Sequence, residues 1–215
     1  LLQGGRTAHA ALRLPFDIIT RESPVCGISA QSGQAKVLAS CKLIVWDECT
    51  MAHKKSLEAL HRTLQFLKSN DYLFGGVPIL LCGDFRQTLP IIPRGTPADE
   101  INACLKSSSL WRNVKTLCLR QNMRITVAEA AAQIFAKDLL AIGEGKIPTD
   151  VDGRIPLSSS VCVVIESLAD LISNVYPDIA MNYLNRDWLC ERAILAARNE
   201  DVGNINVGAN VTIDT

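Results

Sequence analysis

Short apolar segments recur along the chain and are separated by stretches with helical spacing. Five of these segments have the length of buried strands, at residues 43–46, 77–82, 114–119, 161–165 and 193–197. Apolar runs of this length, bounded by turn residues, are typical of strands that are buried on both faces of a parallel sheet. The pattern therefore predicts a strand at each of the five positions.

The stretches between these segments predict helices. From His53 to Ser69, leucines at 57, 60, 64 and 67 recur every three or four residues and share one helix face. A second helix is expected from Thr126 to about Ile142, with Thr126 as N-cap, a capping-box Glu129 and a terminating Gly143. Shorter helices are expected near residues 98–106, 168–176 and 200–205. Alternating strands and helices favour an α/β fold in which helices flank a mainly parallel sheet.

The length of 215 residues allows one large α/β domain or two small ones, and the apolar content of 48% excludes a disordered protein. Residues 143–160 hold Gly, Pro, Asp and Ser and are expected to form a loop or linker. A boundary near residues 111–114 would divide the chain into a first domain at 1–112 and a second at 113–215.

The amino-acid composition argues against membrane-spanning, disulfide-rich and zinc-binding classes of protein. No apolar run reaches the roughly 18 to 20 residues that span a bilayer, so we expect a soluble, intracellular chain. Eight cysteines without a CxxC pair, and three histidines, favour reduced thiols packed in apolar segments over a disulfide framework or a zinc site. Residues 1–112 carry 13 basic and 9 acidic side chains and the remainder carries 9 and 13. This offset is weak evidence for a nucleic-acid partner, because composition drift also produces it.

Two carboxylates follow the first apolar segment, since Asp47 and Glu48 come directly after residues 43–46. A buried parallel strand brings its last residues to the carboxyl edge of the sheet, where α/β proteins bind ligands. In nucleotide-hydrolysing proteins, one such carboxylate holds Mg²⁺ and the other orients and deprotonates the attacking water. The alternative is an exposed acidic pair at the start of the next helix, where negative charge is favourable.

A similar arrangement follows the second apolar segment, which leads into Gly83, Asp84, Phe85, Arg86 and Gln87. If the two strands are neighbours, Gln87 can reach the γ-phosphate of a nucleotide held near Asp47 and report its loss. The alternative is a turn that is capped by Asp84.

Together these segments resemble the Pif-type DNA helicases of superfamily one, in the subgroup carried by Helitron-type transposable elements. Five matches occur in the family's order: GGRTAH at 4–9, WDECTMAHK at 46–54, GDFRQTLP at 83–90, LCLRQNMR at 117–124 and ERAILAARN at 191–199. Each match alone is weak, but five in order are strong, and they cover most of the chain.

The resemblance implies roles for individual residues of a nucleotide site. Asp47 would bind Mg²⁺, Glu48 would activate water, and Gln87 would sense the γ-phosphate and link it to the DNA-facing loop. Arg124 would be an arginine finger that reaches the transition-state charge. Without the motif, a surface arginine would be the simpler interpretation of Arg124.

The resemblance also implies a DNA path. Thr7 and His9 would contact single-stranded DNA, through hydrogen bonds to phosphate or by stacking on a base. A helix-capping threonine and an ordinary surface histidine are the alternatives.

The implied fold is a partial RecA-like parallel sheet flanked by helices, followed by part of a second RecA-like domain. The implied activity is an ATP-dependent DNA helicase that uses ATP and Mg²⁺ and acts on single-stranded and duplex DNA. The family implies movement in the 5′ to 3′ direction, a nuclear location, and roles in DNA repair, recombination and telomere maintenance.

The family's phosphate-binding loop, GxxxxGK[ST], does not occur in the chain and is expected to precede Leu1. Because this loop holds the β- and γ-phosphates, we expect the chain alone to be inactive. A decayed transposon remnant, acting as a DNA-binding or inert module, is the alternative. A dehydrogenase is not supported, because a GxGxxG turn after a strand is absent from the sequence.

Overall fold

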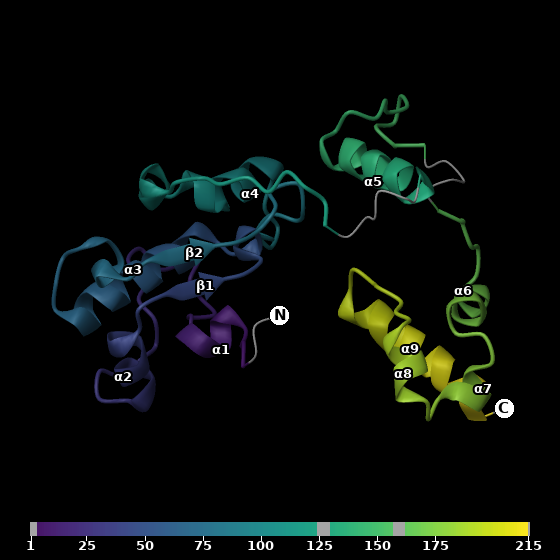
Figure 1. Ribbon diagram of the computed structural model, residues 1–215, viewed down its shortest axis with the longest axis horizontal. Coiled ribbons are helices and arrows are strands. Elements are labelled where there is room, and N and C mark those ends of the chain that lie inside the picture. Colours follow the sequence, from purple (N-terminus) through teal and green to yellow (C-terminus); the bar gives the residue numbers. More distant parts are fainter. Residues whose placement is uncertain (1–3, 124–129, 157–161, 215) are drawn as a thin grey trace. The chain divides into compact units, whose positions relative to one another are not determined.

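The computed structural model describes residues 4–123, 130–156 and 162–214 of the chain (Figure 1). Internal contacts divide the chain into two compact units. The first unit comprises residues 1–133 and 139–146, and the second comprises 134–138 and 147–215. The domain boundary that the sequence predicts at 112/113 remains a prediction.

The first unit is built on a parallel pair of strands, β1 (Ile44–Trp46) and β2 (Ile79–Leu81). Ile44 pairs with Ile79 and Trp46 pairs with Leu81. A parallel pair needs a long crossover, because the chain must return to the same end of the sheet before the second strand begins. The helix α3 (Lys54–Lys68) and the short 3-10 helix η2 (Leu73–Gly76) provide this crossover. Both strands lie within segments that the sequence predicted, and the α/β class is confirmed.

The helix α3 forms where leucine spacing and local caps agree. At its start the His53 Nδ1 accepts a hydrogen bond from the Lys55 backbone N–H at 3.0 Å. At its end Ser69 adopts a left-handed conformation with φ of 51°. Leu57, Leu60 and Leu64 are buried on one face. The helix predicted from 53 to 69 is therefore confirmed within one residue at each end.

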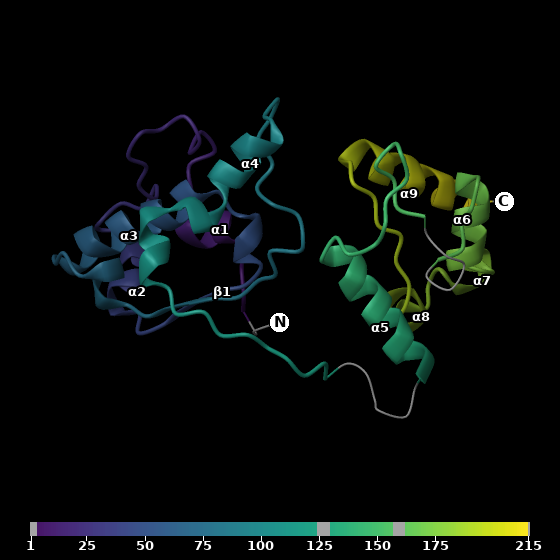
Figure 2. The ribbon, with the colours of Figure 1, turned by 90° about the horizontal axis from the view of Figure 1, so that it is seen from above.

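Short helices complete the first unit. They are α1 (Ala8–Leu12), α2 (Gly33–Ser40), η1 (Cys49–Met51), α4 (Pro97–Ala103), η3 (Leu105–Ser107) and η4 (Ser109–Asn113). At α4 the Thr96 side chain and the Asp99 carboxylate form a capping box, which fixes the start of the helix predicted near 98–106. Helices α2 and α3 pack against each other (Figure 2).

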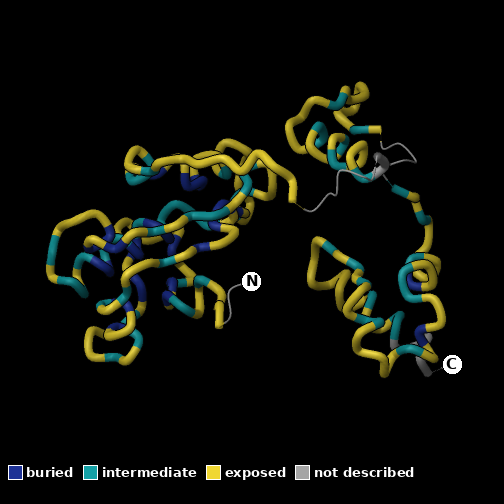
Figure 3. Tube along the Cα trace, viewed as in Figure 1, coloured by how far each residue is buried: buried dark blue, intermediate teal, exposed yellow. Residues whose placement is uncertain are grey.

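The hydrophobic core of the first unit lies on one face of the strand pair. Figure 3 shows its buried residues along α3 and the segments beside it. Trp46 is buried, and Ile79 and Leu81 pack against the core, whereas Val45 and Leu80 on the opposite face are exposed. The sheet therefore buries one face among the described residues, while the sequence pattern predicted burial on both.

The second unit is helical in its described residues. Helices α6 (Leu168–Val175) and α7 (Ile179–Asn182) contact α9 (Asn199–Asp214), and α8 (Arg186–Cys190) lies between α7 and α9 in the sequence. Helix α5 (Ala130–Gly143) has residues in both units. The prediction that α5 ends at Gly143 is confirmed, and its predicted cap Thr126 lies outside the described residues. Helix α9 is longer than the predicted 200–205. Residues 144–156 contain turns without helix or strand, as predicted.

Three predicted strands are wrong in their described parts. Residues 114–119, 162–165 and 193–197 have no strand pairing, and Leu117 and Leu119 are exposed. An apolar run becomes a strand only when another strand offers it hydrogen bonds. In the part of the chain that the structure describes, β1 and β2 pair only with each other.

The eight cysteines are free thiols, and Cys26, Cys49 and Cys104 are buried. Burial, with the nearby Cys82 thiol, raises the pKa of Cys49 to about 11, so this thiol stays protonated at neutral pH. Cys118 was predicted to pack in a strand and is exposed, because its segment joins no sheet. Within the described residues, no helix is both long and apolar enough to cross a membrane.

We expect Leu60→Ala to lower the free energy of unfolding by about 2–5 kcal/mol, because a fully buried leucine leaves a cavity when it is truncated. Phe66→Ala on the same helix is the control, since Phe66 is 69% exposed and its loss should change stability by about 0.5 kcal/mol or less. Urea denaturation followed by circular dichroism measures both. Equal losses would show that α3 does not bury its leucine face.

Candidate functional site

The ends of β1 and β2 lie side by side and lead into the two segments that the sequence singled out. The Cys82 N–H donates to the Trp46 carbonyl at 2.9 Å, and the Cys49 N–H donates to the Cys82 carbonyl at 3.0 Å. Strand-like pairing therefore continues past Trp46 and Leu81 into both loops. Asp47 and the turn at 83–87 follow the same edge of the sheet, as the sequence predicted for neighbouring strands.

Asp47 and Glu48 are exposed at this edge. Glu48 adopts a left-handed backbone conformation, with φ of 49° and ψ of 37°, and its N–H donates to the Asp47 Oδ1 at 3.1 Å. Non-glycine residues in this region are uncommon and are enriched at functional sites. The Glu48 side chain makes no capping hydrogen bond to η1, and α3 is capped by His53 instead. Asp47 and Glu48 thus lie exposed directly before η1, with Glu48 at its N-cap position, as the alternative of an acidic pair before a helix also predicts.

The turn at 83–87 is held by its own aspartate. The Asp84 Oδ1 accepts the Arg86 backbone N–H at 3.0 Å and the Arg86 Nε–H at 2.9 Å. The Gln87 N–H donates to the Asp84 carbonyl at 3.1 Å, which closes the turn. These hydrogen bonds from Arg86 lower the pKa of Asp84, which stays ionised at neutral pH. The predicted capping role of Asp84 is therefore present, and the Gln87 side chain is exposed beside it.

The two loops touch at a contact that sequence reasoning missed. Thr50 is buried, and its hydroxyl lies 3.5 Å from the Asp84 carbonyl oxygen. A Cβ atom at Gly83 would lie 2.8 Å from the Thr50 Cγ2, closer than real Cβ contacts come. Glycine is therefore required at 83 because the backbone of one loop lies against a side chain of the other.

A second contact fixes the turn from its other side. The Phe85 ring meets Trp111 edge-on, with ring centroids 5.6 Å apart, and the Lys106 ammonium lies 4.1 Å from the Phe85 ring centroid. Both kinds of contact are favourable for an aromatic ring. Trp111 itself packs against the core. The turn that carries Gln87 is thus tied to the segment that contains η3 and η4.

The predicted DNA residues lie on α1. The Thr7 hydroxyl caps this helix by accepting the Ala10 N–H at 3.4 Å, so the capping alternative is realised. His9 is exposed, and its ring is nearly parallel to that of Phe16, with centroids 6.1 Å apart and an interplanar angle of 17°. The predicted arginine finger, Arg124, lies outside the described residues.

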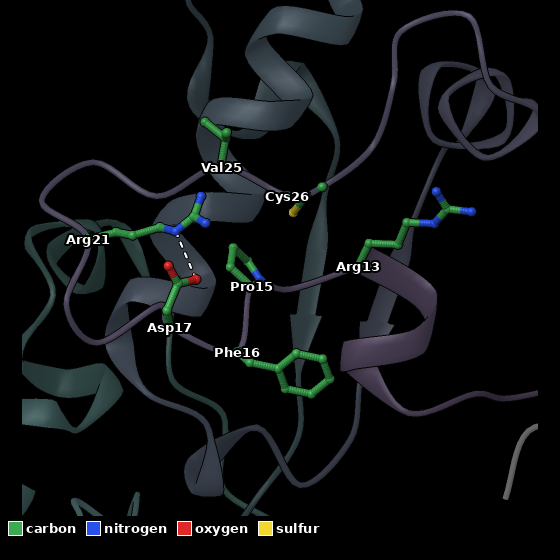
Figure 4. A pocket seen from close by; sticks show the side chains of 8 residues that line it. Arg13, Pro15, Phe16, Asp17, Arg21, Val25 and Cys26 are labelled. Carbon is green, nitrogen blue, oxygen red and sulfur yellow. Dashed lines mark hydrogen bonds and ion pairs between the residues drawn. The ribbon is translucent and has the colours of Figure 1, made fainter.

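A hollow of about 440 Å³ follows α1 (Figure 4). Pro15 and Phe16 line it together with Val25, Cys26 and two arginines, Arg13 and Arg21. The Arg21 Nε is 2.9 Å from the Asp17 Oδ1, and this hydrogen bond lowers the pKa of Asp17. The hollow lies in the segment after α1, apart in sequence from the strand ends that carry Asp47 and Gln87.

The donor atoms at the strand ends fit a hard divalent cation. Mg²⁺ is usually held by one or two carboxylates, with water and phosphate oxygens completing its shell. Asp47 and Glu48 supply such carboxylates, and both are open to solvent. Within the described residues, the structure has no group of three or more His, Cys, Asp or Glu side chains that could hold a metal ion.

Known proteins resemble this chain in sequence. ATP-dependent DNA helicase PIF1 of Danio rerio is 26% identical over 161 residues, which are 74% of this chain and 24% of that protein. ATP-dependent DNA helicase Pif1 of a Psychrobacter species is 25% identical over 203 residues, covering 94% of this chain and 27% of that protein. The chain thus spans about a quarter of the length of these relatives.

The fold resembles solved structures as well. A Pif1 helicase from Bacteroides, in complex with ADP-AlF3 and ssDNA, matches with a TM-score of 0.61 and 20% identity over 95% of this chain and 43% of that one. The likeness supports a partial RecA-like fold. The model of the PIF1-like helicase family matches residues 1–153, which is more than half of the chain. The chain therefore belongs to the PIF1-like helicase family.

Proposed function

We propose that this chain is part of the motor of an ATP-dependent DNA helicase, which couples ATP hydrolysis to movement along single-stranded DNA and to duplex unwinding. The observation that carries the proposal is the parallel pairing of β1 and β2, which sets Asp47, Glu48 and the Gln87 turn at one edge of the sheet. A nucleotide that occupied this edge would meet both loops at once.

In this proposal each residue at the edge of the sheet has a separate role in ATP hydrolysis. Asp47 would hold the Mg²⁺ that accompanies ATP, and that ion would supply positive charge to offset the charge of the phosphates. Glu48 orients the attacking water and accepts its proton. The Gln87 amide contacts the γ-phosphate, and its turn responds when that phosphate leaves. Arg124, by its place in the motif LCLRQNMR, supplies positive charge to the transition state.

Movement would follow from the nucleotide cycle. ATP draws two motor domains together, and its hydrolysis releases them, so that the grip on the DNA strand alternates. Thr7 and His9 contribute to this grip on the first domain. Contacts to the DNA backbone dominate such binding, and affinity should therefore fall steeply as salt rises.

The subgroup, cellular location, direction of movement and biological roles of this helicase are also proposals. The five motif matches in the family's order support a Helitron-associated member of the family. The family resemblance supports a nuclear location, 5′ to 3′ movement, and roles in DNA repair, recombination and telomere maintenance.

We expect Glu48→Gln to lower DNA-stimulated ATP hydrolysis by about 10²- to 10⁴-fold, because the neutral amide cannot accept a proton from water. The assay uses a natural polypeptide that joins this chain to a GxxxxGK[ST] loop, and ATP binding should be retained. Glu22→Gln, at another exposed glutamate, is the control. Equal rates for Glu48→Gln and the unchanged protein would remove the proposed base. A polypeptide that neither binds ATP nor hydrolyses it would favour an inert transposon remnant.

We expect Gly83→Ala to lower the free energy of unfolding by about 1–3 kcal/mol, because the added methyl group overlaps Thr50. Thr50→Ser removes the Cγ2 atom that makes the closest contact, so the double variant should lose less than the two single losses together. The coupling should be at least about 0.5 kcal/mol in a double-mutant cycle measured by chemical denaturation.

Gly33→Ala is the control for this cycle, since a Cβ atom at Gly33 would meet nothing within 4 Å. We expect no loss of stability from this change. Additive losses for Gly83→Ala and Thr50→Ser would show that the contact between the two loops is not the reason for the glycine.

A further inference from the structure

The Phe16 side chain is 97% exposed, although it is apolar. A phenylalanine ring in water forgoes roughly 1.5–3 kcal/mol of burial. The His9 ring lies beside it, with the centroids 6.1 Å apart, but covers little of it, because Phe16 remains 97% exposed. Both faces of the Phe16 ring are therefore open to a ligand.

The surroundings of Phe16 form a hollow with apolar and charged walls. The hollow has a volume of about 440 Å³, within the range of roughly 300–1,000 Å³ that is typical of small-ligand sites. Figure 4 shows Pro15 near its middle, with Arg13 on one side and the Asp17–Arg21 pair on the other. Val25 adds a partly exposed apolar wall. In Figure 4 the Phe16 ring and the Arg13 side chain extend in different directions, so an extended ligand lying along residues 13–16 would meet the flat apolar ring at one part and the cation at another.

The charges at the hollow favour an anionic group next to the ring. The Asp17 carboxylate is matched by Arg21 at 2.9 Å. Arg13 has no carboxylate within 4 Å among the described residues, and the same holds for Arg6 at the start of α1. A ligand with a planar, uncharged face and a nearby negative charge therefore fits this hollow. A nucleobase with its phosphate has both features.

We propose that Phe16 is a stacking residue for one base of single-stranded DNA and that Arg13 contacts a neighbouring phosphate. The inference rests on the proposed function and extends the DNA path beyond Thr7 and His9. The Phe16 and His9 rings differ by 17° in orientation, so bases that are stacked along one strand can lie parallel to both. Stacking needs no particular base, which suits a protein that moves along DNA of any sequence.

The test measures binding of the full chain to a fluorescent oligothymidylate by anisotropy, together with an oligonucleotide of equal length that lacks bases. Phe16→Ala should weaken binding of oligothymidylate by about 5- to 150-fold, the factor expected for one stacked base. Binding of the abasic strand should not change, because the phosphates remain. Phe16→Trp should preserve binding, since tryptophan also offers a flat ring.

Phe66→Ala is the matched control, because Phe66 is also exposed but lies on α3. Unchanged binding of oligothymidylate by Phe16→Ala would overturn the stacking role while the proposed function stands. Displacement of the oligonucleotide by free ATP, with weaker ATP binding in Phe16→Ala, would assign the hollow to a free nucleotide instead. Absence of DNA binding by the unchanged chain would also refute the subsite, whereas the Glu48→Gln assay tests the nucleotide chemistry separately.

Discussion

The parallel pairing of β1 with β2 is the constraint on which the rest of the first unit depends. Two strands alone are marginal, because they leave edges and a face open to water. Here the buried leucines of α3 cover one face, and the crossover that makes the pair parallel is the same helix. The element that stabilises the pair also decides its direction. A parallel direction is what sets Asp47 and the turn at 83–87 at one edge.

Beyond the strand ends, contacts between the two loops, and no longer the sheet, fix where the loops lie. The Cys49–Cys82 hydrogen bond joins the two loops, and Thr50 lies against Gly83. Phe85 then fastens the turn to Trp111. Gln87 is exposed, and its backbone N–H donates to the Asp84 carbonyl, so its placement depends on the contacts that hold the turn. The proposed sensor role of Gln87 would need such a support, because a freely moving side chain could not report the loss of a phosphate through its loop.

Sequence patterns predicted the local features well and the long-range ones poorly. The helix α3 followed from the leucine spacing over residues 53–69, a pattern that lies within a short stretch of sequence. The run at 114–119 was predicted as a strand like β1, but among the described residues it has no strand to pair with, and a short sequence window does not show which segments will find a partner. Thr50 and Trp111 were missed for the same reason, since their partners lie more than twenty residues away. The edge shared by Asp47 and Gln87 was predicted because parallel strands require it.

One side chain can stabilise the fold and still have an atom free to bind a ligand. The Thr7 hydroxyl accepts the Ala10 N–H with a lone pair, and its own proton remains available to a phosphate oxygen. At the strand ends the Asp84 carboxylate is not available to a ligand in this way, because it forms an ion pair with the Arg86 guanidinium. Asp47 accepts the Glu48 N–H at Oδ1 and has its other oxygen for a ligand. Of the carboxylates that follow β1 and β2, Asp47 and Glu48 are thus the pair with capacity for a cation and a water, whereas Asp84 serves the turn.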